Sequence, residues 1–162
     1  MRMIVHMGNR DEKLYTNIRE GKTVEQKEFM GRKFLISGAV KKAAWKMTGA
    51  QKTILSYPCQ EAVMINEKDT VTAWFTTAIP VSAGPRGWTG LPGMILAATL
   101  NSDISMTATA VDAGPVADGI IVQPKSGKKV SPEEFKAIVD EKMKEMGGAE
   151  SNGNVRIIMR RE

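Results

Sequence analysis

Four glycines and two prolines fall within the ten residues from Gly84 to Gly93, and no other stretch constrains the fold as strongly. Glycine readily adopts positive φ, and proline fixes φ and lacks an amide hydrogen, so this stretch is neither helix nor the interior of a sheet. Trp88 and Leu91 are the side chains expected to anchor the stretch by becoming buried. The apolar run 94–96 follows directly. The sequence therefore predicts a rigid loop that joins two strands.

Short runs of alternating apolar and polar residues occupy most of the chain on both sides of this loop. Period-two runs with turn residues between them, at roughly 8–12-residue intervals, are typical of antiparallel β structure. Tight turns are expected at 20–22, 66–69 and 101–103. The predicted strands are 13–19, 24–29, 34–36, 41–47, 52–55, 59–66, 70–77, 94–100, 104–111, 120–122 and 155–159.

One helix is expected, near the end of the chain. Ser131 to Glu134 has the pattern of a capping box, with proline at the first helical position. Apolar residues then recur at helical spacing through Met143 and Met146, and two glycines follow. We therefore predict a helix at 132–146 whose apolar side, both methionines included, lies on the sheet and covers the aromatic residues around the loop.

The expected fold class is mainly β, or α+β. The strands form a curved antiparallel sheet, a partly open barrel-like meander, and one C-terminal amphipathic helix covers a face of it. A length of 162 residues with 42% apolar residues fits a single domain over 1–162. No run of 18 apolar residues is present, so no membrane span is expected.

Charge and aromatic content exclude some partners. The net charge is +5, but Lys and Arg never form runs longer than two, and aromatic residues make up only 6% of the chain. Nucleic-acid binding is therefore not expected, and solvated edge strands explain the basic residues. The same exposed edges would allow an oligomer to form.

The stretch 90–96 reads Gly-Leu-Pro-Gly-Met-Ile-Leu. It resembles the motif behind the name of the GLPGLI family, with Met94 in place of a leucine; this is a family of small envelope proteins of Bacteroidetes that has no established function. The stretch 45–59 resembles the family's K-I-T and K-T-I-L-G-Y-P-C segments, with Ser56 in place of a glycine. The stretches 73–76 and 79–85 resemble its AWFT and IPVSxGP segments.

The resemblance implies export and a periplasmic or cell-envelope location. Against the family, this chain is expected to begin after the usual signal peptide and first strands. The family carries no established activity, so the resemblance assigns no catalytic residue to this chain.

Candidate chemistry is sparse. His6 and Cys59 are the only histidine and cysteine, and they form no cluster with ligand spacing, so no metal or other cofactor is expected. The eleven methionines are scattered and are expected to fill the core. No base lies near Cys59 in the sequence, so Cys59 is expected to be a buried structural thiol. A reactive nucleophile is the alternative.

Aromatic residues offer the other candidate site. Trp74, Phe75 and Trp88, together with Leu91, either line a ligand groove or share one core, since a curved sheet buries aromatic side chains in both cases.

Three functions remain open from the sequence. The chain is a non-enzymatic envelope protein that binds an apolar ligand or a protein partner, with the loop at the rim of the site. Alternatively, it is a thiol- or metal-dependent envelope enzyme that uses Cys59. A third possibility is a structural subunit that offers exposed sheet edges for strand addition.

Overall fold

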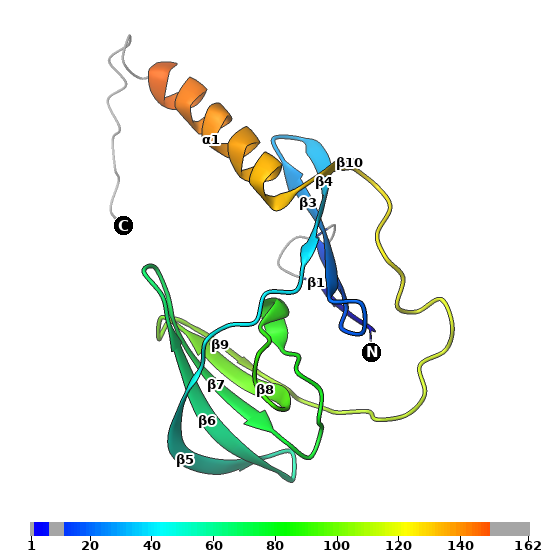
Figure 1. The fold of residues 1–162 in the computed structure, drawn as a ribbon, viewed down its shortest axis with the longest axis vertical. Helices are drawn as coiled ribbons and strands as arrows, with labels where there is room; N and C mark the ends of the chain where they lie inside the picture. Colours follow the sequence, from blue (N-terminus) through cyan, green and yellow to red (C-terminus); the bar gives the residue numbers. More distant parts are fainter. Residues whose placement is uncertain (1, 7–11, 150–162) are drawn as a thin grey trace, which may run out of the picture.

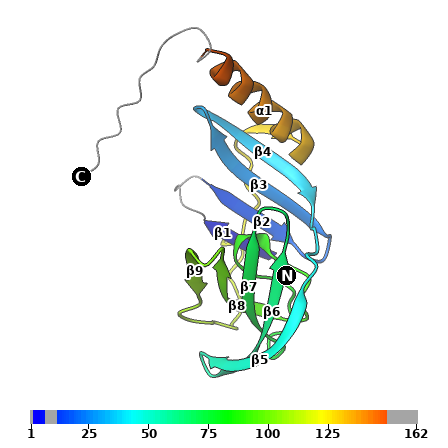
Figure 2. The same ribbon diagram turned by 90° about the vertical axis from the view of Figure 1, so that its left-hand side faces the viewer.

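The computed structural model describes residues 2–6 and 12–149. Two five-stranded sheets and one long C-terminal helix make up this part of the chain (Figure 1). The sequence prediction of a mainly β fold with a C-terminal helix is confirmed. The strands form two separate sheets instead of one continuous meander, and neither sheet closes into a barrel (Figure 2).

The first sheet has the strand order β1-β2-β3-β4-β10. Four strands form an antiparallel meander, and β10 adds to the edge of β4 in parallel. The hairpin expected at 20–22 is present. The strands are β1 (Arg2–His6), β2 (Lys13–Asn17), β3 (Lys22–Phe29), β4 (Arg32–Ala39) and β10 (Lys128–Val130).

The second sheet is an antiparallel meander in sequence order. Its hairpins turn at 66–69 and 101–103, as the sequence predicts. A register shift between Met47 and Gln51 shows that the glycine expected to make a turn here, Gly49, lies instead in a bulge of a continuous strand. The strands are β5 (Lys46–Ile54), β6 (Tyr57–Ile65), β7 (Thr70–Thr76), β8 (Met94–Leu100) and β9 (Ile104–Thr107).

The helix α1 (Pro132–Ala149) begins with the predicted capping box. The Glu134 amide donates to Ser131 Oγ at 3.1 Å, and the Ser131 amide donates to Glu134 Oε2 at 2.7 Å. Phe135 packs edge-on against Phe29 and Phe34, with ring centroids 6.2 and 5.3 Å apart. The first two turns of α1 therefore dock on one face of the first sheet.

Two expectations about the helix are wrong. Met143 and Met146 are 59% and 55% exposed, because the distal half of α1 extends past the edge of the sheet (Figure 1). The helix also lies on the first sheet and not over the aromatic residues of the second, so it does not cover the predicted aromatic bed. Helical periodicity identifies an apolar side but not the length of the surface that receives it.

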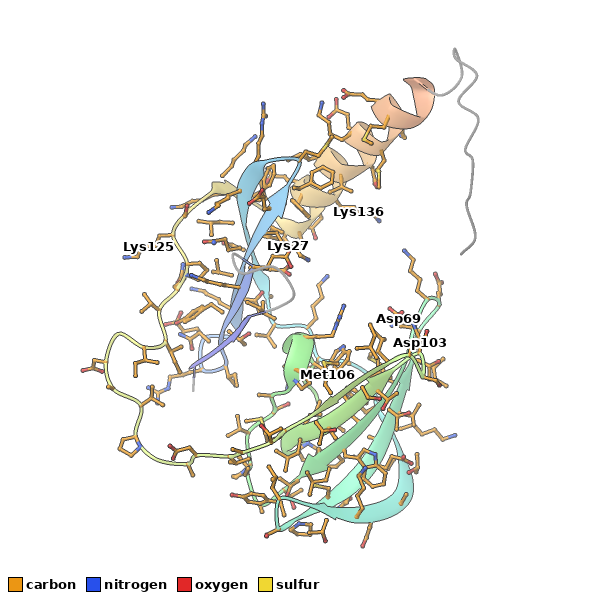
Figure 3. All side chains as sticks on the ribbon, turned by 180° about the vertical axis from the view of Figure 1, so that it is seen from behind. Lys27, Asp69, Asp103, Met106, Lys125 and Lys136 are labelled. Carbon is orange, nitrogen blue, oxygen red and sulfur yellow. The ribbon has the colours of Figure 1, made fainter. Side chains whose placement is uncertain are left out.

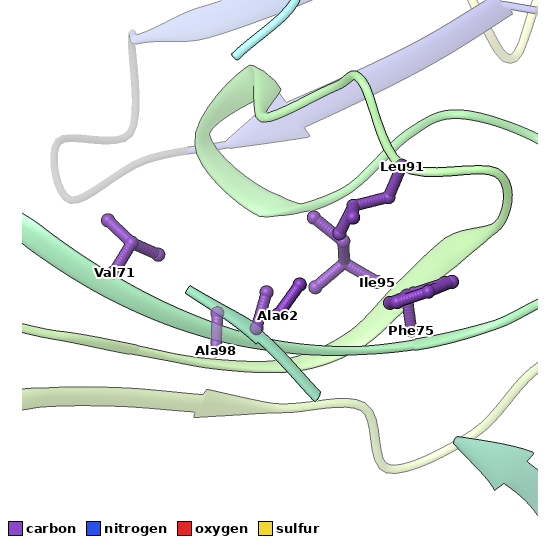
Figure 4. Close-up of a cluster of buried hydrophobic side chains, with 7 residues drawn as sticks. Ala62, Val71, Phe75, Leu91, Ile95 and Ala98 are labelled. Carbon is purple, nitrogen blue, oxygen red and sulfur yellow. The ribbon is translucent and has the colours of Figure 1, made fainter. Parts of the chain in front are cut away.

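The loop from 79 to 93, called here the inner loop, packs on the apolar face of the second sheet. Leu91 of this loop is 2% exposed and packs with Phe75 and Ile95 in the main hydrophobic cluster (Figure 4). Trp45 and Trp88 pack against the same cluster. The prediction that Trp88 and Leu91 anchor this loop is confirmed.

The inner loop also contacts the first sheet and the segment that connects the two sheets. Trp45 lies in the connection between the sheets, and its Nε1 donates to the Thr89 carbonyl at 2.8 Å. Thr89 Oγ1 donates to the Lys41 carbonyl at 3.0 Å. The short 3-10 turn η1 (Pro85–Gly87) within the loop lies against β1 and β2, where a Cβ on Gly87 would come within 2.7 Å of Leu14.

Four local predictions need correction or fall outside the description. Residues 41–45 are irregular, because Trp45 turns toward Thr89 instead of pairing in a strand. Residues 120–122 are irregular as well. The strand predicted at 104–111 is shorter, because β9 ends at Thr107. β10 corresponds to none of the predicted strands. The strand expected at 155–159 lies outside the described residues.

The closeness of the inner loop to β7 gives a test of its packing. Gly93→Ala places a Cβ against the carbonyl oxygen of Thr76, closer than any unstrained contact allows. We expect it to lower the free energy of unfolding by about 3 kcal/mol, measured by urea denaturation. Gly147→Ala is the control, because nothing lies within 4 Å of its added methyl group. It should leave stability unchanged or raise it by up to about 1 kcal/mol. A Gly93→Ala protein as stable as the wild type would contradict the packing described.

A second test concerns the docking of the helix. Phe135→Ala removes the ring that contacts Phe29 and Phe34, so it should cost about 2–3 kcal/mol of unfolding free energy. Met143→Ala, farther along the same helix, should change stability by less than about 0.5 kcal/mol because Met143 is exposed. Equal losses in the two variants would mean that the helix docks along its whole length.

Candidate functional site

The structure separates the aromatic residues proposed as a ligand site. Phe75 and Leu91 are 1% and 2% exposed inside the hydrophobic cluster, and Trp88 packs on its edge. A side chain so completely buried contacts protein atoms and leaves no free surface for a ligand. The arrangement of these three residues therefore favours the shared core over the open groove.

Trp74 lies on the opposite face of the second sheet, because neighbouring residues of a strand point to opposite sides. Its cross-strand partners are Glu61 and Ala97. The ammonium of Lys52 lies 4.2 Å from the centre of the Trp74 ring, a cation–π contact. Trp74 therefore takes no part in the cluster around Phe75.

Cys59 is a free thiol and is 1% exposed. Its Sγ donates to the Tyr57 carbonyl at 3.5 Å. Burial raises the pKa of the Cys59 thiol, while the backbone hydrogen bond from Ile54 and the charge of Lys52 lower it by less. A hollow of about 350 Å³ adjoins the thiol, and no histidine or carboxylate is among the described residues that line it. The thiol is therefore protonated at neutral pH, and the described residues that line this hollow include no histidine or carboxylate to act as a base.

A different candidate site lies on the face of the first sheet that α1 does not cover. Residues 108–127, called here the strap, run without helix or strand from the second sheet to β10 and pass along this face (Figure 1). Beneath the strap, Tyr15, Val24 and Leu35 form a buried apolar cluster. Ile121 of the strap packs against that cluster.

Three adjoining hollows follow this face under the strap. The first, of about 510 Å³, lies between the β2–β3 turn and strap residues 116–121. The second, of about 270 Å³, shares Asn17 and Glu20 with the first. The third, of about 300 Å³, shares Val24, Ser37 and Gln123 with the second. Together they form one groove, with the sheet as its floor and the strap as its roof.

Charge is unevenly distributed along the groove. The first hollow is lined by both signs, with Arg19 beside Glu20 and Asp118. The third hollow is lined by Lys125 and Lys129, with no acidic residue among the described residues around it. Figure 3 shows Lys125 extending from the strap. The groove therefore has an apolar floor and one distinctly basic end.

One sequence signal points to this groove. Phe34, Leu35 and Ile36 are consecutive apolar residues in a strand, and the structure buries all three. Alternation buries every second residue, so three in succession require cover on both faces of the sheet. The helix supplies one cover. The second cover is the strap, whose irregular backbone has no periodicity that sequence reasoning detects.

No group of three or more His, Cys, Asp and Glu side chains within 2–6 and 12–149 is placed to hold a metal ion. Within the same residues, no helix has the length and apolar character needed to cross a bilayer.

Comparison with known proteins gives one family match. Residues 63–97 match a family described as "Protein of unknown function (Porph_ging)". The matched region runs from β6 through the inner loop into β8. None of the curated protein sequences matches the chain.

Solved structures of a larger protein share the fold. The structure of PNGF-II in the C2 space group aligns with a TM-score of 0.62 and 19% identity over 80% of this chain. The structure in the P21 space group aligns with a TM-score of 0.61 and 18% identity, also over 80% of this chain. The chain spans about a quarter of the length of PNGF-II, 25% and 24% in the two structures. At this identity the likeness concerns the fold alone.

The burial of Cys59 gives a measurable expectation. Iodoacetamide at pH 8 should label the native thiol at least about 100-fold more slowly than the urea-unfolded thiol, because Sγ is inaccessible and its pKa is raised. The raised pKa also makes the stability of the folded state depend on pH. Its contribution to stability is fully present below the ordinary thiol pKa and is lost as the pH rises above that value. Cys59→Ser, which removes the titrating group, should show less loss of stability at high pH. Rapid labelling of the native protein would restore the nucleophile hypothesis.

Proposed function

We propose that this chain is a non-enzymatic binding module of the cell envelope, which holds an apolar ligand or an apolar segment of a protein partner in the groove beneath the strap. The observation that carries the proposal is the groove itself: three adjoining hollows above a buried apolar floor. Sites for small ligands are typically concave and mainly apolar, with a few polar groups that fix orientation.

The floor of the groove supports this proposal. Tyr15, Val24 and Leu35 are 6%, 7% and 3% exposed, so the strap and the sheet together keep them from water. Each such side chain represents about 1.5–3 kcal/mol of burial free energy, and a ligand that lies between the sheet and the strap would keep these side chains from water. Ser37 and Gln123 lie between two of the hollows and offer polar groups beside the apolar surface.

The strap is held loosely enough to move outward and admit a ligand beneath it. Its hydrogen bonds include short-range ones, from the Ile120 amide to Ala117 and from the Gly114 amide to Asp112. Its contact with the apolar cluster is made by Ile121. Val116, Ile120 and Val122 are 56%, 65% and 48% exposed, so these three apolar side chains of the strap are only partly buried.

The family resemblance extends the proposal to location. The motif at 90–96 lies within the region that matches the uncharacterised family, which supports placing the chain in the GLPGLI family. With that placement, the chain is a periplasmic or cell-envelope protein.

Strand addition at a sheet edge is the second candidate function. β5 is an edge strand of the second sheet, and its first eight residues are all exposed. A long exposed edge presents unpaired backbone groups to which another strand can add. An envelope protein could use this edge to bind a partner or a second copy. The thiol-enzyme alternative has less support, because Cys59 is buried and no histidine or carboxylate is among the described residues around its hollow.

Filling the groove tests the proposed function. Ser37→Phe places a ring between the second and third hollows, so it should weaken binding of the neutral apolar probe N-phenyl-1-naphthylamine by about tenfold. Probe fluorescence measures the affinity. The control is Ser105→Phe, because Ser105 is an exposed serine on a strand of the second sheet, away from the groove. Equal affinity of the wild type and Ser37→Phe, or no binding by either protein, would exclude the groove as an apolar site.

A further inference from the structure

We propose that the ligand of this groove is an anionic amphiphile of the fatty-acid type, whose carboxylate binds between Lys125 and Lys129 and whose alkyl chain lies over Val24 and Leu35. This inference rests on the proposed function and adds the chemical class of the ligand. It is carried by the composition of the third hollow, which combines an apolar lining with two cations.

The hollow has an apolar interior. Val24 and Leu35 come from the floor of the groove, and Pro124, which is also buried, comes from the strap. The hollow continues through Ser37 and Gln123 into the second hollow, so an extended chain has room to follow the sheet. In the second hollow Tyr15 and Val24 supply the apolar surface, and the other side chains that line it are polar or charged. An alkyl chain makes no hydrogen bonds, so it would lie along the apolar side chains of the floor.

The two lysines reach the hollow from different elements. Lys129 pairs with Leu35 in the parallel register of β10 and β4, so its side chain is on the groove face. Lys128 and Val130 pair with Phe34 and Ile36 and belong to the face that α1 covers. Lys125 belongs to the strap, so a ligand held by both lysines bridges the floor and the roof.

The charges are available for an anion. Among the described residues, neither Lys125 nor Lys129 forms an ion pair, and no acidic residue lines the third hollow. The acidic residues of the groove are Asp118, which lines the first hollow at the other end, and Glu20, which lines the first and second hollows; in the second, Lys22 accompanies Glu20. The distribution of charge thus gives an amphiphile one orientation, with its anionic group at the lysine end and its chain directed toward the centre.

Three ligands with the same alkyl chain separate the contribution of charge from that of apolar burial. Decanoate, decanol and decyltrimethylammonium should bind to the wild-type protein in that order of decreasing affinity, as measured by isothermal titration calorimetry. Two exposed charge pairs are worth roughly tenfold together, so decanoate should bind about tenfold more tightly than decanol at low salt. That preference should shrink as ionic strength rises.

Lysine variants locate the anion. Lys125→Ala/Lys129→Ala should lose the roughly tenfold preference for decanoate while keeping the affinity for decanol. Lys128→Glu is the matched control, because it is the adjacent lysine of the same strand on the opposite face, and it should bind decanoate like the wild type. Circular dichroism and urea unfolding check that each variant is folded.

The outcomes distinguish this inference from the proposed function. If decanoate and decanol bind equally and Ser37→Phe weakens both, the groove is an apolar site but the anionic class is wrong. If decanoate binding is lost equally in Lys125→Ala/Lys129→Ala and Lys128→Glu, the effect is one of net charge and the assigned position is wrong. If none of the three ligands binds, the proposed function fails together with this inference.

Discussion

The burial of three consecutive residues in β4 is the constraint on which the functional account depends. Phe34 and Ile36 face α1, and Leu35 faces the strap. A strand in a two-layer structure buries one face, so the first sheet must be covered on both sides to keep these residues from water. The cover over Phe34 and Ile36 is a capped helix, and the cover over Leu35 is an irregular segment. That difference creates the groove.

The two sheets differ in how their apolar faces are covered. In the second sheet the inner loop closes the core with Leu91 and Trp88, and glycines allow its backbone to approach the neighbouring strands closely. In the first sheet the strap crosses at a distance that leaves hollows between it and the floor. A filled core contributes stability, whereas a loosely covered face leaves room for a ligand. The proposed binding site therefore lies on the first sheet, whereas the glycine- and proline-rich inner loop packs into the core of the second sheet.

The predictable parts of this fold are those set by local physical chemistry. The capping box at Ser131, the hairpin turns and the buried anchors of the inner loop follow from hydrogen-bonding groups, turn residues and side-chain size. Features that depend on long-range geometry could not be predicted from the sequence. β10 is too short to show a period, the exposure of Met143 depends on where the sheet ends, and Gly49 makes a bulge only because β6 pairs on both sides of it.

The candidate site was predictable only in part. The sequence identifies Trp74, Phe75, Trp88 and Leu91 as notable, but the parity of β7 places Trp74 on the face opposite to Phe75. The apolar triplet in β4 was the available signal for the groove, and its meaning depends on what covers each face. Lys125 and Lys129 are two of many lysines in the sequence, and only the strand register brings Lys129 to the groove side.

Methyl and indole NMR spectra recorded during a titration with decanoate test most directly which sheet carries the site. The account predicts that the methyl signals of Val24, Leu35 and Ile121 shift as the ligand enters the groove, while the indole N–H signals of Trp45 and Trp88 stay in place. Shifts of the two indole signals with unchanged methyl signals of the first sheet would place the site at the inner loop and contradict the account.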